Sequence, residues 1–261
     1  RDFVAEYVGQ VAILMTNLSR LAEDFILWSS SEFSFIELSD KFASTSSVMP
    51  QKKNPDILEL TRGKTAQVIG YQMAILSNIK GLPSGYSRDL QQIKASIWSA
   101  SKIAISALVV INAMLKTLKV NKQKMKKALD LGYSVSLDIA EQLVKDGIPF
   151  RIAHAILGKL VQTVSKSKKP LSTLSISEIR KSLSDSGVEA KKLYKIIQDM
   201  TAHSSLNERT SHGSSGRSEQ QRMISDRKKK IQAYRIGTTK RTNEVKTAFE
   251  NLSKKVKTLT K

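Results

Sequence analysis

Two adjacent serines, Ser46 and Ser47, lie shortly before two adjacent lysines in a polar segment of the chain. Asn54 is a good helix N-cap and Pro55 suits the first helical position, so we expect a helix to begin at Pro55. Its unpaired N–H groups and the charge of Lys52 and its neighbour predict a site for a carboxylate or phosphate. In that field a serine hydroxyl loses its proton more readily. The same residue types also fit a plain capped helix after a polar loop.

The segment from residue 45 to residue 55 resembles the signature of the fumarase/aspartase superfamily of lyases, Gly-Ser-Ser-x-Met-Pro-x-Lys-x-Asn-Pro. The chain reads Thr-Ser-Ser-Val-Met-Pro-Gln-Lys-Lys-Asn-Pro. Thr45 replaces the glycine, which can alter the mobility of the loop. Within the superfamily, Met-Pro-Gln-Lys-Lys-Asn-Pro-Asp resembles the argininosuccinate lyases. Adenylosuccinate lyases and fumarases usually carry other residues after Met-Pro.

A second segment, residues 81–94, reads Gly-Leu-Pro-Ser-Gly-Tyr-Ser-Arg-Asp-Leu-Gln-Gln-Ile-Lys. It is similar to the Gly-Leu-Pro-x-x-Tyr-Asn-Lys-Asp-Leu-Gln-Glu-Asp-Lys of argininosuccinate lyases. The resemblance implies the substrate-binding residues Tyr86, Arg88, Gln91 and Lys94. Arg88 keeps the charge of the usual lysine but not its shape, and Gln92 and Ile93 replace an acidic pair. The residue types alone fit a helix start with an exposed polar face.

Three stretches that begin at residues 1, 55 and 89 carry apolar residues every three or four positions, which predicts long helices. The seam of the first consists of Val4, Val8, Val11, Met15, Leu18, Ala22 and Phe25. Three such helices cannot bury their seams alone. Because the chain opens at Arg1 already in helical register, we expect a missing N-terminal portion to complete the bundle, with other subunits.

The predicted fold class is all-α, with the long helices of a central bundle followed by a small C-terminal helical domain. We assign 1–118 to the bundle, including the signature loop 39–55, and 119–216 to the small domain. Asn121 can cap its first helix. Residues 136–154 resemble the C-terminal domain of argininosuccinate lyases. Ser- and Gly-rich residues 204–216 predict a loop.

The composition excludes several kinds of site. The chain has no cysteine and only three widely spaced histidines, so we expect no disulfide, no metal site and no cofactor. His154 is expected to be packed in a helix, whereas His203 and His212 should lie at the surface or in loops. No apolar run is expected to reach membrane-spanning length, and no signal peptide is visible. A soluble cytoplasmic protein follows.

The net charge of +20 raises the possibility of nucleic-acid binding. Residues 217–261 hold fourteen Lys or Arg and four Asp or Glu, so this tail contributes 14 − 4 = +10. It has only two aromatic residues, too few for a row of base-stacking platforms. Its apolar residues repeat at helical spacing. We therefore expect a basic amphipathic helix that docks on its own protein or a partner subunit rather than on nucleic acid.

The resemblance implies that argininosuccinate is split reversibly into arginine and fumarate. It assigns Ser46 as the base that takes the proton from the succinyl carbon, and Lys52 and Asn54 as the groups that hold the carboxylate. Ser47 would help bind substrate. In the family a glutamate matching Glu59 pairs with a histidine from the N-terminal portion, which this chain does not contain.

The resemblance also implies a homotetramer whose active sites each draw on three subunits, so we expect the chain to be inactive alone. Two alternatives remain open. A related lyase such as adenylosuccinate lyase would bind a nucleotide phosphate. A non-enzymatic helical scaffold would keep the seams but catalyse no elimination.

Overall fold

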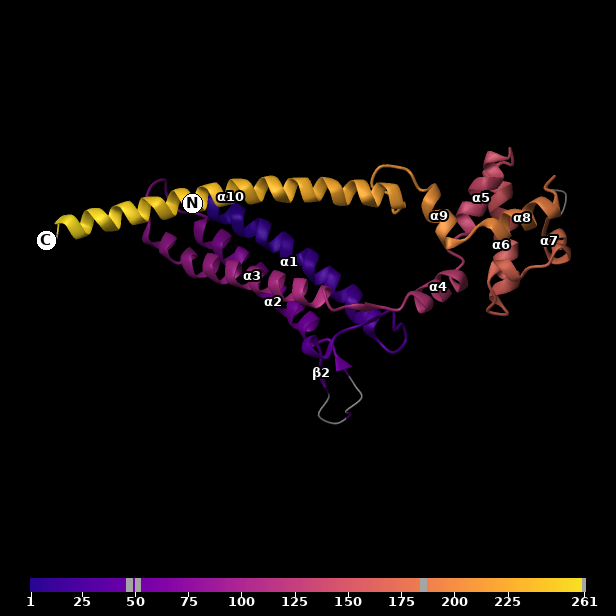
Figure 1. Cartoon of the computed structure of the whole chain (residues 1–261), viewed down its shortest axis with the longest axis horizontal. Helices are drawn as coiled ribbons and strands as arrows, with labels where there is room; N and C mark the ends of the chain where they lie inside the picture. The colour runs from indigo at the N-terminus through magenta and orange to yellow at the C-terminus, as the bar shows by residue number, and fades with distance from the viewer. Residues whose placement is uncertain (46–48, 50–52, 184–186, 260–261) are drawn as a thin grey trace. The chain divides into compact units, whose positions relative to one another are not determined.

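The computed structural model describes residues 1–45, 49, 53–183 and 187–259. The chain divides into two compact units, Arg1–Lys127 and Ala128–Lys261 (Figure 1). Helices dominate both units, which confirms the predicted all-α class.

Three long helices form the body of the first unit, namely α1 (Asp2–Ser29), α2 (Asp56–Ile79) and α3 (Ile93–Leu115). The predicted seam of α1 is confirmed, since six of its seven residues are buried and Leu18 is partly buried. The first part of the seam, from Val4 to Met15, packs against α2 and α3. The partners are Val68 and Ile75 of α2 and Ile93, Ala100 and Ala104 of α3. The small alanines let α3 approach its neighbours closely.

One buried hydroxyl fixes α2 against α1. Thr65 Oγ1 donates to the carbonyl of Met15 at 3.0 Å and lies 2.9 Å from the carbonyl of Thr61 in its own helix. A buried polar group costs little free energy when it is hydrogen-bonded. The hydrogen bond therefore adds a directional contact to an otherwise apolar interface.

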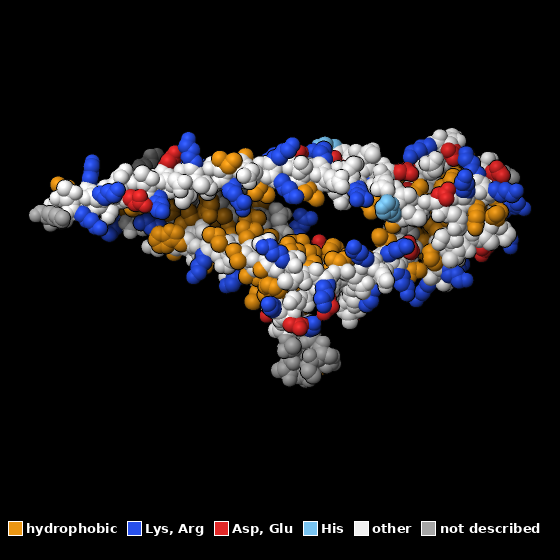
Figure 2. Space-filling view, viewed as in Figure 1, with side chains coloured by type: hydrophobic (Ala, Val, Ile, Leu, Met, Phe, Trp, Pro, Cys, Tyr) orange, Lys and Arg blue, Asp and Glu red, His pale blue; other side chains and the backbone are white. Residues whose placement is uncertain are grey.

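The expectation that no apolar run reaches membrane-spanning length was wrong for the stretch that contains α3. The stretch Arg88–Leu115 is long and apolar enough, by length and composition, to cross a membrane, with a mean hydropathy of 1.6. Core helices of soluble proteins pass the same test, and α3 places Ile93, Ala100 and Ala104 in the core with α1 and α2. Its other face exposes large apolar side chains, and Figure 2 shows hydrophobic side chains gathered over the bundle.

The segment between α1 and α2 is not a plain loop. Strand β1 (Ile36–Glu37) pairs antiparallel with β4 (Lys119–Val120), and β2 (Ser44–Thr45) pairs antiparallel with β3 (Lys53–Asn54). A short 3-10 helix, η1 (Asp40–Phe42), lies between β1 and β2. Two-residue strands carry no readable periodicity, which is why the sequence did not predict them.

The start of α2 differs by one residue from the prediction. Pro55 is the N-cap and Asp56 the first helical residue, and within the described part of the chain no side-chain hydrogen bond caps the helix. Asn54 instead belongs to β3, where it is paired with Ser44. Its backbone is therefore extended, and the Pro55 carbonyl accepts the first helical hydrogen bonds.

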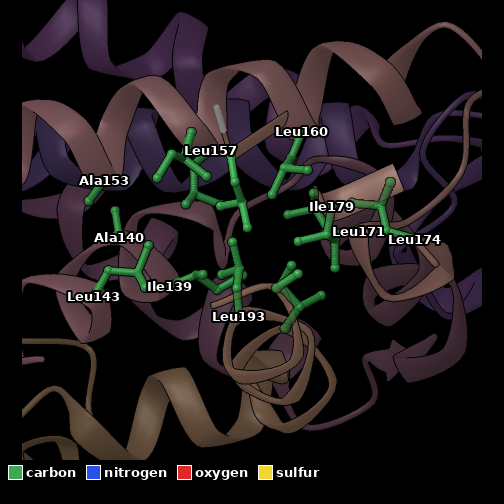
Figure 3. Close-up of a cluster of buried hydrophobic side chains, with 14 of the residues drawn as sticks. Ile139, Ala140, Leu143, Ala153, Leu157, Leu160, Leu171, Leu174, Ile179 and Leu193 are labelled. Atoms are coloured by element: carbon green, nitrogen blue, oxygen red, sulfur yellow. The ribbon is translucent and has the colours of Figure 1, made fainter. Parts of the chain in front are cut away.

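The second unit contains a compact helical domain built on α5 (Ser136–Lys145), α6 (Phe150–Ser165), α7 (Ile176–Leu183) and α8 (Ala190–Asp199). Helix α4 (Lys122–Leu131) leads into it, and the 3-10 helix η3 (Leu171–Thr173) joins α6 to α7. Ile139, Leu160, Ile179 and Leu193 converge from the four helices on one apolar core (Figure 3). The Asn121 cap is confirmed, because its side chain accepts from the Lys124 N–H at 3.1 Å.

Two expectations for this unit were wrong. Residues 204–216 are not all loop, because α9 (Ala202–Glu208) is held by a capping box in which Thr201 and Ser204 each accept from the other's backbone N–H. His154 is exposed on α6, with its ring 6.0 Å from that of Phe150. His203 and His212 are exposed, as predicted.

The basic tail is one helix, α10 (Arg217–Leu259), which confirms the helical interpretation of residues 217–259 (Figure 1). Its start is anchored by Glu219, which is buried and accepts from the Gly213 N–H at 2.7 Å and from Arg222 at 2.6 and 2.7 Å. The surface on which α10 docks stays a prediction.

Candidate active site

The signature segment is held together at its base. Ser46, Ser47 and Lys52 lie outside the described residues. On either side of them, Ser44 pairs with Asn54 and the backbone of Thr45 pairs with that of Lys53. The β2–β3 ladder therefore brings the two ends of the segment side by side, directly before α2.

The N-terminus of α2 lies directly after the signature segment. The first turn carries Asp56 and Glu59, and Glu59 is exposed, with its N–H donating to the Pro55 carbonyl at 3.1 Å. The remaining N–H groups of the turn make this end partially positive. One carboxylate oxygen of Asp56, Oδ1, is buried and has no hydrogen-bond partner among the described residues.

Lys53 is tied to two acids beside the hairpin. Its Nζ lies 2.6 Å from Asp40 Oδ1 and 3.2 Å from Glu37 Oε1. The hydrogen bond from Lys53 lowers the pKa of Asp40, and the hydrogen bonds to Asp40 and then Glu37 raise the pKa of Lys53. Glu37 Oε2 also lies 3.9 Å from Lys119 Nζ. The sequence indicated the positive charge of Lys53 but did not predict its acidic partners, because no local spacing of residues reveals them.

The second predicted group lies on one turn before α3. Tyr86 is 70% exposed, and its hydroxyl accepts from Gln91 Nε2 at 3.0 Å. Arg88 and Gln91 belong to the 3-10 helix η2 (Arg88–Gln91), and Lys94 follows in the first turn of α3. All four side chains are exposed, so this turn forms a polar and basic surface.

Asp89 and Ile93, which lie beside the predicted binding residues, make structural contacts within the chain. Ser87 donates a hydrogen bond to Asp89 and lowers the pKa of that carboxyl group. Ile93, which departs from the acidic family pattern, is buried among α1 and α2 and belongs to the core. The departure therefore changes packing in addition to charge.

The two groups lie at opposite ends of α2. The hairpin precedes Asp56, and the Tyr86 turn follows Ile79. The 24 residues of α2 span about 36 Å at 1.5 Å per residue. A substrate the size of an amino acid cannot touch both groups in one chain, so the predicted residues fall into two half-sites.

A separate groove of about 530 Å³ lies between α2 and α3. It is lined mainly by apolar side chains such as Leu60, Tyr71 and Ile103, with Lys64 and Lys102 also in its lining. It contains none of the predicted catalytic residues. Within the described ranges, no group of three or more His, Asp or Glu could hold a metal ion.

Comparison with known proteins shows the broad class of protein to which the chain belongs. Residues 1–70 match a family model described as lyase, and residues 133–202 match one described as argininosuccinate lyase C-terminal. A solved EDDS lyase variant with bound fumarate is 26% identical, with a TM-score of 0.74 over 90% of this chain and 47% of that one. Class II fumarase from Schistosoma mansoni, 24% identical with a TM-score of 0.61 over 77% of this chain and 39% of that one, shares the fold. The chain is thus a member of the fumarase/aspartase superfamily.

The curated relatives show which family within this superfamily the chain resembles. Argininosuccinate lyase of Nitrosopumilus maritimus (strain SCM1) is 60% identical over 98% of this chain and 53% of that protein. Argininosuccinate lyase of Syntrophus aciditrophicus (strain SB) is 47% identical over 69% of this chain and 38% of that protein. The chain belongs to the argininosuccinate lyase family. It spans about half the length of the curated relatives it matches.

Proposed function

We propose that the protein to which this chain belongs catalyses the reversible elimination of argininosuccinate to arginine and fumarate. The observation that carries the proposal is the β2–β3 ladder, which joins the ends of the signature segment at the N-terminus of α2. The 60% identity with an argininosuccinate lyase over nearly the whole chain supports it.

The chemistry requires a base and a place for negative charge. Removing a proton beside a carboxylate pushes charge into a group that is already anionic, so cations and N–H donors fixed in advance lower the barrier. Ser46 is the proposed base. Lys52, Asn54 and the N-terminus of α2 would hold the carboxylate of the dianion, and Ser47 would help bind the substrate.

The departing guanidinium nitrogen needs a proton. Glu59 is exposed on the first turn of α2, where it could orient an acid supplied from outside this chain. Tyr86, Arg88, Gln91 and Lys94 would bind the substrate's charged groups from the other half-site. Their exposure fits a surface that meets another subunit.

We further propose a homotetramer in the cytoplasm. The roughly 36 Å length of α2 separates the half-sites, so a complete site needs residues from more than one chain. The apolar side chains exposed on α3, among them Trp98, Ile105 and Val109, supply a surface that other subunits would cover.

A chimaera tests the activity. Residues 1–261 would be joined to the N-terminal half of the Nitrosopumilus maritimus relative and assayed for fumarate release from argininosuccinate. We expect turnover by the chimaera, none by the 261-residue chain alone, and a loss of about 1,000-fold or more in kcat for Ser46→Ala, as when a reacting group is removed.

The same assay addresses the alternatives. Release of fumarate from adenylosuccinate but not from argininosuccinate would assign the related lyase. An assembled, folded tetramer that cleaves neither substrate would favour the non-enzymatic scaffold. Activity of the 261-residue chain alone would contradict the proposal that a complete site needs further residues.

A further inference from the structure

We propose that Lys53 is a positioning residue whose ion pairs with Asp40 and Glu37 determine which face of the hairpin Asn54 presents to the substrate. This inference rests on the proposed function for its catalytic consequence, but its structural part concerns only described residues. Lys53 and Asn54 are the two residues of β3.

The side chain of Lys53 is occupied on one face of the ladder. Its ammonium group lies between two carboxylates, 2.6 Å from Asp40 Oδ1 and 3.2 Å from Glu37 Oε1. Asp40 comes from η1 and Glu37 from β1. One lysine thus joins the hairpin to two successive segments of the connection between α1 and α2.

The acids are themselves held by the backbone around them. Glu37 pairs with Lys119 in the β1–β4 ladder, and Lys119 Nζ lies 3.9 Å from its second carboxylate oxygen. The Asn121 N–H donates to the Phe35 carbonyl at 2.8 Å and extends this anchorage. The two carboxylates and two ammonium groups balance in charge, so the cluster needs no further counter-ion.

Because Lys53 is held in place, the geometry of the strand also fixes the direction in which the Asn54 side chain points. Successive side chains of a strand point to opposite faces, so holding Lys53 toward Asp40 directs Asn54 to the other face. A slip of the ladder by one residue would exchange the two. A strand of two residues has few hydrogen bonds to resist such a slip. The ion pairs add the missing restraint.

The direction of the pKa shifts agrees with this geometry. Asp40 has a lowered pKa and Lys53 a raised one, so both groups stay charged across the neutral range. Isolated exposed ion pairs contribute little to stability, whereas networks with good geometry contribute more. We therefore expect an effect on the local hairpin and not on global unfolding.

Enzyme kinetics test the catalytic consequence in the full-length protein. We expect Lys53→Met to lower kcat about tenfold with a smaller change in KM, since misplacement near the reacting atoms costs rate. Lys53→Arg should restore kcat to within about threefold, because an arginine can still reach both acids. Lys53→Glu combined with Asp40→Lys should recover part of the loss caused by Lys53→Glu alone.

A matched control comes from the same unit. Arg62 pairs with Glu23 at 2.5 Å, and its side chain is 40% exposed, against 42% for Lys53. This pair joins α1 to α2 and contains no residue of the hairpin. Arg62→Met therefore removes an ion pair of similar exposure and should change kcat less than about twofold.

Amide hydrogen exchange of the strand residues Ser44, Thr45, Lys53 and Asn54 tests the structural part without any substrate. We expect faster exchange in Lys53→Met and wild-type exchange in Arg62→Met. If exchange rises but the wild-type protein never cleaves argininosuccinate, the positioning role stands and the proposed function fails. If kcat falls while exchange stays unchanged, Lys53 acts on the substrate directly and the positioning role is overturned. Unchanged kcat and exchange would overturn it too.

Discussion

The helical domain of the second unit and the bundle of the first differ in how they bury their apolar residues. The domain closes α5 to α8 around one core, in which Ile139, Leu160, Ile179 and Leu193 are nearly inaccessible. The bundle buries one face of each helix but leaves Trp98 69% and Ile105 62% exposed on α3. The domain also exposes a few apolar side chains, such as Phe150 at 51%, but the most exposed residues of α3 lie together on one long helix. Because exposed apolar patches of this kind mark interaction surfaces, we expect the open face of the bundle to be covered by another chain.

The largest effect is expected in the core of the domain. Leu193→Ala removes a side chain with 0% exposure, and leucine-to-alanine changes in cores cost about 2–5 kcal/mol. Thermal unfolding of the chain, followed by circular dichroism, should show the second unit melting earlier and the first unit unchanged. A simultaneous loss of both transitions would contradict the independence of the domain.

The second-largest effect is expected at Gly216, which lies close to the backbone of Arg209. A Cβ on Gly216 would lie 1.8 Å from the Arg209 carbonyl oxygen, so Gly216→Ala must displace backbone. We expect a cost of about 1–3 kcal/mol, as in overpacked sites. Gly158 on α6 has nothing within 4 Å of the position that a Cβ would occupy. Gly158→Ala should therefore be neutral or slightly stabilising in the same denaturant titration.

Acid should loosen the start of α10 before it unfolds the domain core. Hydrogen bonds from Arg222 and then Gly213 lower the pKa of Glu219 from 4.5 to about 2. Its folded-state pKa is depressed, so its stabilisation is complete above pH 4.5 and is lost as the pH falls toward 2. The protection of the Gly213 amide, which is the intrinsic exchange rate at the same pH divided by the observed rate, should fall over this window, and Glu219→Gln should remove that pH dependence.

The smallest effect on the chain itself is expected on the open face of the bundle. Ile105→Ser changes a side chain that is 62% exposed, so the unfolding free energy should move by less than about 0.5 kcal/mol. In the full-length protein the same change should weaken the assembly, measured by analytical ultracentrifugation. If Ile105→Ser destabilised the isolated chain as much as Leu193→Ala, the contrast between the two regions would be wrong.

The long helices could be predicted from the sequence, whereas the two-residue strands and the ion pairs that depend on them could not. The seam from Val4 to Phe25 was readable because it repeats over several turns of helix. The β2–β3 ladder was not, because two residues show no alternation, and Lys53 meets Asp40 and Glu37 only through that ladder. The exposed His154 shows the limit of assigning burial from residue type.

The Thr65 hydroxyl has a consequence for how the chain can vary in length. Its bond to the Met15 carbonyl joins two points that are 50 residues apart and fixes the helical phase of α2 against α1. An inserted residue between them within either helix would rotate the following side chains by about 100° and break the bond. Insertions and deletions should therefore be rejected within the two helices, between Met15 and the end of α1 and between the start of α2 and Thr65.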